Sequence, residues 1–121
     1  MTIYNETVIE AIAGEIPHFI SGKRLAHTYA VERECRALGA LFSAHPTLMS
    51  EEDVCKLRIA AMLHDITKEK SVDEHAALAA KYAIPLTDLE KSTPKVLHSK
   101  TAPPLARETI NEKLEIGRAH V

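Results

Sequence analysis

The hydrophobic residues of this 121-residue chain recur at spacings of three and four, which is the pattern of amphipathic helices. No segment shows the apolar and polar alternation of a β-strand. The pattern predicts five helices, which cover approximately residues 6–15, 21–44, 50–67, 71–82 and 103–112. We therefore expect an all-α protein, a helical bundle of a single domain.

The third predicted helix is hydrophobic on nearly every side, which is typical of a central, buried helix. Its most hydrophobic stretch, Leu57–Ile66, contains two polar neighbours, His64 and Asp65. Burying an ionised carboxylate without a partner costs several kcal/mol, a large part of the stability of a small domain. Because a bound metal ion offsets such a cost, this pair marks a candidate metal site.

Composition and charge exclude several classes of function. The formal net charge is −2 and Trp is absent, so the chain offers neither a basic surface nor a stacking platform for nucleic acid. No hydrophobic run approaches the roughly 20 residues of a membrane span, and the N-terminus has no signal-peptide pattern. Two isolated cysteines, Cys35 and Cys55, suit a reducing compartment. We expect a cytoplasmic protein without nucleic-acid or membrane partners, and the sequence leaves a homodimer open.

Seven histidines are a high count for a chain of this length. Three separate segments carry candidate ligands, with His27 in the second helix, His64 and Asp65 in the third, and His98 before the last. Imidazole nitrogen and carboxylate oxygen suit zinc, iron or manganese in the core of a bundle. The alternative is a core histidine that forms a hydrogen bond, and spacing alone leaves both readings open. His75 lies in a polar stretch, and we expect it at the surface.

Two cations flank these candidate ligands. Arg24 precedes His27 by three residues and Lys68 follows Asp65 by three, so each shares a helix face with its neighbour. Cations beside a metal site suit phosphate oxygens, which makes Arg24 and Lys68 candidates for substrate binding. The alternative is a solvated charge in an i,i+3 pair, which is the commoner fate of a single Lys or Arg.

Three blocks of the sequence, in this order, resemble one known family. Lys23–Val31 resembles the Arg-x-x-His-Thr-x-x-Val opening of the YqeK family of HD-domain metal phosphohydrolases, and Ala61–Lys68 resembles its Leu-His-Asp-x-x-Lys core. The stretch from Tyr82 through Pro94–His98 is similar to the next block of that family. The resemblance covers about residues 8–110.

The resemblance implies an HD-domain-like helical bundle and a bacterial cytoplasmic enzyme that hydrolyses diadenosine tetraphosphate symmetrically to two ADP. It also implies a transition-metal centre, most often iron and in a mononuclear or dinuclear form. The metal ligands that it implies are His27, His64, Asp65 and His98. Asp65, Lys68 and Arg24 are then the candidate catalytic residues, with the two cations assigned to phosphate by the local chemistry described above.

The C-terminal part of the chain departs from this family. Its members have further His ligands and a final Asp ligand beyond the point where this chain stops, so we expect residues 1–114 to form an incomplete HD domain. Residues 115–121 back-translate as GAG ATC GGA AGA GCA CAC GTC, which resembles a widely used DNA-sequencing adapter. We expect a non-native tail there; the alternative is a genuine polar terminus.

Two other functions remain open. One is an HD phosphohydrolase that acts on another nucleotide, such as a nucleoside monophosphate or guanosine tetraphosphate, which a substrate panel would distinguish. The other is a metal-free helical module that binds a nucleotide or a protein partner. That module would be purified without stoichiometric metal, and the substitution His64→Ala would leave its binding intact.

Overall fold

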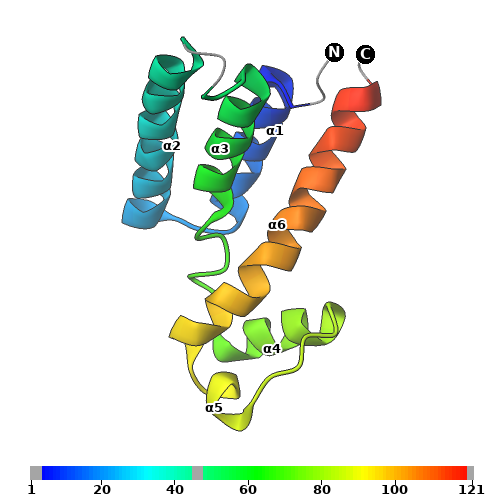
Figure 1. The fold of residues 1–121 in the computed structure, drawn as a ribbon. Coiled ribbons are helices and arrows are strands. Elements are labelled where there is room, and N and C mark those ends of the chain that lie inside the picture. The colour runs from blue at the N-terminus through cyan, green and yellow to red at the C-terminus, as the bar shows by residue number, and fades with distance from the viewer. Residues whose placement is uncertain (1–3, 45–47, 120–121) are drawn as a thin grey trace.

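The computed structural model of the protein describes residues 4–44 and 48–119, with side chains described as far as residue 115. Every regular element in this part of the chain is a helix, which confirms the predicted all-α fold (Figure 1). The helices are α1 (Glu6–Glu15), η1 (Ile16–His18), α2 (Gly22–Ser43), α3 (Glu51–Leu63), α4 (Val72–Lys81), α5 (Asp88–Lys91) and α6 (Pro94–Ala119).

The helices form two groups that share the long helix α6. Figure 1 shows α1, α2 and α3 beside one another, with α4 and α5 gathered near the beginning of α6. Lys81 on α4 bonds Glu108 on α6 with a distance of 3.1 Å between Nζ and Oε1, and Lys113 near the end of α6 bonds Glu15 of α1 at 2.8 Å. Helix α6 therefore connects the α4 region to the α1–α3 group.

The core follows from the hydrophobic stripe of α1 and its continuation through η1. Asn5 begins α1, because its side-chain oxygen accepts a hydrogen bond from the backbone of Val8 at 3.1 Å. The apolar residues that follow recur on one face of the chain and lie against α3 and α6. The largest of the fully buried apolar side chains are Ile12, Ile16, Ile20, Met62, Ile66 and Leu97.

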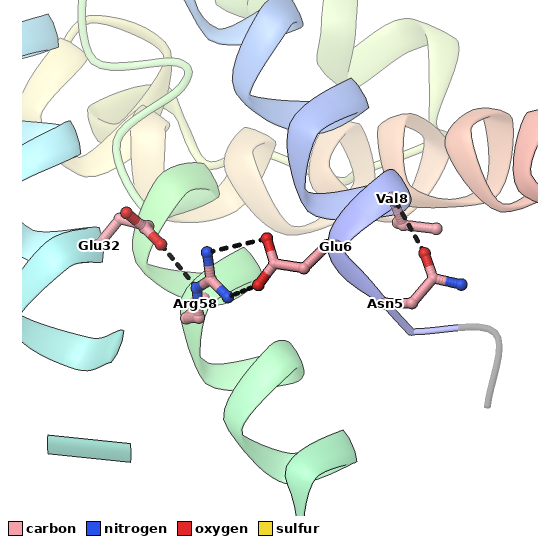
Figure 2. Close-up of polar contacts among 5 residues, drawn as sticks. All are labelled: Asn5, Glu6, Val8, Glu32 and Arg58. Carbon is pink, nitrogen blue, oxygen red and sulfur yellow. Dashed lines mark hydrogen bonds and ion pairs between the residues drawn. The ribbon is translucent and has the colours of Figure 1, made fainter. Parts of the chain in front are cut away.

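A charged cluster, in which Arg58 and Glu32 are buried and Glu6 is exposed, joins the first three helices (Figure 2). Arg58 on α3 donates from Nε to Glu32 on α2 at 2.7 Å, and its terminal nitrogens bond Glu6 on α1. The side chains of Arg58 and Glu32 are only 7% and 12% exposed. A buried charge without its partner is costly, so this cluster requires the three helices to be in register. The bond to Arg58 also lowers the pKa of Glu6.

The predicted end of the third helix is wrong. Helix α3 stops at Leu63 and His64 is its C-cap, whereas the hydrophobic pattern predicted a helix to about Thr67. Tight turns replace the last helical turn, and one of them is closed by the Lys68 amide, which donates to the Asp65 carbonyl at 3.0 Å. The candidate pair therefore lies where the chain leaves the helix and not inside it.

The predicted start of the last helix is also wrong, because α6 begins at Pro94 and runs through Pro103 and Pro104. The helix continues into the predicted tail as far as Ala119, while His120 and Val121 lie outside the described residues. Among the helices that the structure describes, none is both long and apolar enough to cross a membrane.

Candidate functional site

His64 has a fixed orientation at the end of α3. Its Nδ1 lies 2.6 Å from the carbonyl oxygen of Ala61, and a carbonyl only accepts hydrogen bonds, so Nδ1 carries the proton. Its Nε2 lies 3.1 Å from Oδ2 of Asp65. The side chain of Asp65 is 10% exposed and that of His64 is 43% exposed, so the pair lies at the border between core and solvent.

This geometry suits a shared cation. With Nδ1 protonated, Nε2 and the Asp65 oxygen both present lone pairs to the same region, and they are compatible only if a second imidazole proton or a metal ion compensates them. A metal-ligating His commonly donates its other ring N–H to a backbone carbonyl, as His64 does to Ala61. His64 and Asp65 therefore fit as two ligands of a metal ion.

The complete predicted ligand set is not assembled. Catalytic metal sites usually have three protein ligands, and among the described residues no group of three or more His, Cys, Asp or Glu side chains could hold a metal ion. His27 is exposed on α2, and His98 is half-buried near the start of α6. The structure thus brings His64 and Asp65 together, and the metal-binding role of all four predicted ligands stays a prediction.

A basic pocket lies next to the pair. It has a volume of about 460 Å³ and is lined by Arg24, Lys68, Pro94, Lys95 and His98. Three of these were predicted as site residues from separate segments of the sequence, and the fold brings them together. Lys68 also places its Nζ 3.5 Å from Oδ1 of the Asp65 carboxylate, which connects the pocket to the candidate pair. None of the described residues that line the pocket is an acid, so the pocket suits an anion.

Two contacts hold the pocket walls together. Glu69 accepts hydrogen bonds from the backbone N and the Oγ of Ser21, both at 3.0 Å, and lies 3.6 Å from the guanidinium of Arg24. The Ser21 bonds and Arg24 lower the pKa of Glu69. Thr67 donates from Oγ1 to the His98 carbonyl at 3.2 Å. The turns after α3 are therefore fastened to the starts of both α2 and α6.

Comparison with known families gives one match, in which residues 24–116 correspond to the family described as HD domain. This chain belongs to the HD-domain family. The matched part of this HD domain contains the predicted pair, the predicted cations and both further histidines, His27 and His98. No curated protein and no solved structure matches the chain. The match supports hydrolase chemistry of the metal-dependent phosphohydrolase superfamily, without a substrate.

Lys95 is a residue of the HD-domain pocket that the sequence interpretation missed. It precedes His98 by three residues, which is the spacing that separates Arg24 from His27. That repeated spacing was a usable signal, because it places a cation one turn from each candidate histidine. The hydroxyl of Ser21 does not cap α2, although a serine before a helix commonly does. Ser21 stands at the N-cap position, but its side chain makes no cap hydrogen bond and bonds Glu69 instead.

His75 is buried, which contradicts its predicted place at the surface of the HD domain. It is 0% exposed between α4 and α6, and its Nδ1 lies 2.9 Å from Oγ1 of Thr101. Thr101 donates its own proton to the Leu97 carbonyl at 3.1 Å, so His75 donates from Nδ1 and its Nε2 has no hydrogen-bond partner. Burial lowers the pKa of His75, and electrostatic interactions with His98 and Lys70 lower it further. This histidine therefore has a structural role.

Proposed function

We propose that this HD-domain protein is a phosphohydrolase of the YqeK type that cleaves diadenosine tetraphosphate symmetrically to two ADP. One observation carries the proposal: a pocket with three Lys or Arg side chains lies beside a His–Asp pair whose geometry suits a metal. The proposal includes the bacterial cytoplasm as its location, in agreement with the resemblance in sequence.

The pocket residues divide the binding of phosphate between them. The planar guanidinium of Arg24 can bond two phosphate oxygens at once, and the carboxylate of Glu69 limits its movement. Lys68, in the turns after α3, and Lys95, on α6, contribute point charges. Because Lys68 also contacts Asp65, a phosphoryl group held by Lys68 lies next to the candidate pair. Such cations stabilise the negative charge that develops during phosphoryl transfer.

The proposed metal ligands are His27, His64, Asp65 and His98, and the proposed metal is iron in a mononuclear or dinuclear form. A bound metal would lower the pKa of a coordinated water and polarise a phosphoryl oxygen. The contribution of this chain is positional, because the bond from His64 to the Ala61 carbonyl orients the imidazole before any metal binds. Asp65 is the proposed catalytic carboxylate, held between His64 and Lys68.

Product analysis tests the substrate and the cleavage position together. The 121-residue chain, supplied with ferrous or manganous ions, should convert diadenosine tetraphosphate to ADP as the only nucleotide product. Formation of ATP with AMP would contradict symmetric cleavage. Faster hydrolysis of guanosine tetraphosphate or a nucleoside monophosphate would support the alternative within the same family. Nucleotide binding without hydrolysis would support the non-catalytic module.

The substitutions Lys68→Ala and Lys91→Ala test the basic pocket. Loss of one charge-stabilising group at a reacting centre lowers kcat by about 100-fold, and we expect a loss of this order for Lys68→Ala. Lys91 is exposed on α5 and bonds Asp88, so Lys91→Ala should retain the wild-type rate. Elemental analysis completes the test: metal bound by the wild type should be lost in His64→Ala. Equal activity of the two lysine variants would contradict the proposed pocket.

A further inference from the structure

A second cavity lies next to the basic pocket and has the opposite chemical character. Its volume is about 290 Å³, and every described residue that lines it is apolar except His64. The apolar lining comes from the end of α3 and the middle of α6. It includes Ala60, Leu63, Ala102, Ala106 and Ile110.

The two cavities follow one another along the same two segments. On α6, His98 lines the basic pocket and Ala102 lines the apolar cavity, a separation of about 6 Å along the helix axis. In the segment that follows α3, Lys68 lines the basic pocket and His64 lines the apolar cavity. Asp65 contacts both Lys68 and His64. A ligand with a phosphate in one cavity and an apolar group in the other would therefore cross the His–Asp pair.

We infer that the apolar cavity is the subsite for the nucleobase of the substrate. It binds the base by apolar packing and not by hydrogen bonds to the polar groups at the edge of the base. This inference rests on the proposed function, because the phosphate pocket supplies the anchor. A volume of 290 Å³ lies at the lower end of the range of about 300–1,000 Å³ for small-molecule sites. It therefore suits one ring system and not a whole nucleotide.

The lining explains the expected tolerance toward different bases. His64 is the only polar residue among those described there, and both of its ring nitrogens are engaged, by the Ala61 carbonyl and by Asp65. No lining side chain is left to distinguish an amino group from a carbonyl on a base. Discrimination by a site without such polar groups is weak, whereas a site built to hydrogen-bond its ligand discriminates strongly.

Calorimetric titration with AMP, GMP and ribose 5-phosphate tests the subsite on the 121-residue chain. AMP and GMP should bind about tenfold more tightly than ribose 5-phosphate, since burying the apolar surface of a base against the lining contributes about this factor. The two nucleotides should agree within about threefold. Equal affinity for AMP and ribose 5-phosphate would overturn the subsite while leaving the phosphate pocket in place. Absence of binding for all three compounds would overturn both.

Filling the cavity provides a second test with a matched control. Ala60 is exposed and lines the cavity, so Ala60→Trp should fill it and bring the affinity for AMP down to that for ribose 5-phosphate. Ala37 is an exposed alanine on α2 away from both cavities, and Ala37→Trp should retain the preference for AMP. Retention of the preference in Ala60→Trp, with a helical circular-dichroism spectrum, would overturn the assignment.

Discussion

At the scale of single residues, His75 is the clearest case of a side chain whose protonation is coupled to folding. Its Nδ1 donates to Thr101, and its Nε2 faces the interior without a hydrogen-bond partner. A second proton would therefore place a charge in a buried site. Burial is the largest cause, followed by electrostatic interactions with His98 and Lys70, and Glu74 opposes them; the pKa of His75 is lowered from its ordinary value of 6.5.

The stability of the protein should fall as the pH decreases below 6.5, the ordinary pKa of His75. Below this pH the unfolded chain protonates His75 more readily than the folded chain does. The contribution of neutral His75 to the free energy of unfolding is therefore fully present above pH 6.5 and is lost as the pH falls toward the pKa of the folded state. The carboxylates with lowered pKa values, such as Glu6 and Glu15, act only at lower pH, below their ordinary value of 4.5.

Urea denaturation followed by circular dichroism between about pH 5 and pH 8 measures this dependence. The variant His75→Asn can still donate to Thr101 but does not titrate, so its midpoint should be independent of pH above the range of the carboxylates. His18 is exposed, and His18→Asn should behave as the wild type does. A wild-type midpoint that stays constant over the whole range would contradict the coupling.

His64 and His75 also show where a local sequence pattern loses its predictive value. The hydrophobic stretch around His64 predicted burial and the polar stretch around His75 predicted exposure, yet His64 is half-exposed and His75 is fully buried. The first difference arises because α3 ends at Leu63, so the chain turns outward at His64. The second arises because α6 covers His75. The hydrophobic and polar pattern around His75 cannot predict a contact with a residue more than 20 positions away in the sequence.

At the scale of the elements, the packing of α2 on α3 depends on one buried glycine. A methyl group on Gly39 would lie 2.6 Å from Cγ1 of Val54, closer than carbon atoms approach one another. Val54 is β-branched and has few alternative rotamers, so the helices would have to move apart. Gly14, in contrast, is exposed in α1, and a methyl group there would contact nothing within 4 Å.

The substitutions Gly39→Ala and Gly14→Ala should therefore change stability in opposite directions. Alanine in a helix gains about 0.5–1 kcal/mol over glycine, and Gly14→Ala should gain this amount. In Gly39→Ala the steric conflict costs about 1–3 kcal/mol and should exceed the gain. Chemical denaturation measures both differences. The double variant Gly39→Ala with Val54→Ala relieves the clash, and a failure to recover stability there would contradict the role assigned to Val54.

The helices could be predicted wherever a cap and an amphipathic stripe coincide. Ser50 with Asp53 and Ser71 with Glu74 form capping boxes at the starts of α3 and α4. Helix α6 was predicted too short because Pro103 and Pro104 lack the N–H groups that would bond the carbonyls of Ser99 and Lys100. Those two residues are exposed. Water can therefore satisfy their carbonyls, and the helix tolerates both prolines.

At the scale of the whole molecule, the sequence indicated the family but not the arrangement of the candidate site. The three sequence blocks correctly indicated the HD-domain family, which the match over residues 24–116 confirms. The order of the blocks along the chain does not predict that Arg24, Lys68 and His98 line one pocket. Nor does it reveal that His64 contacts Asp65 where α3 ends, because the arrangement of side chains depends on how all helices pack.

The outer end of α2 carries an unusual group of exposed apolar side chains. Leu38, Leu41 and Phe42 are 50%, 70% and 47% exposed, and Leu48, after the same helix, is 65% exposed. Leu38, Leu41 and Phe42 are three and four residues apart and therefore share one face of the helix. Soluble monomers rarely expose contiguous apolar patches of large area, and such patches commonly mark sites of association.

The 121-residue chain should therefore associate with itself as its concentration rises, because burying this apolar face removes it from water. Sedimentation velocity over a concentration series measures the association. Leu41→Glu places a charge in the centre of the patch and should shift the protein toward the monomer. Leu89 is 77% exposed on α5, away from the patch, so Leu89→Glu should associate as the wild type does. A monodisperse wild-type monomer at all concentrations would contradict the prediction, and equal association of both variants would show that another surface is responsible.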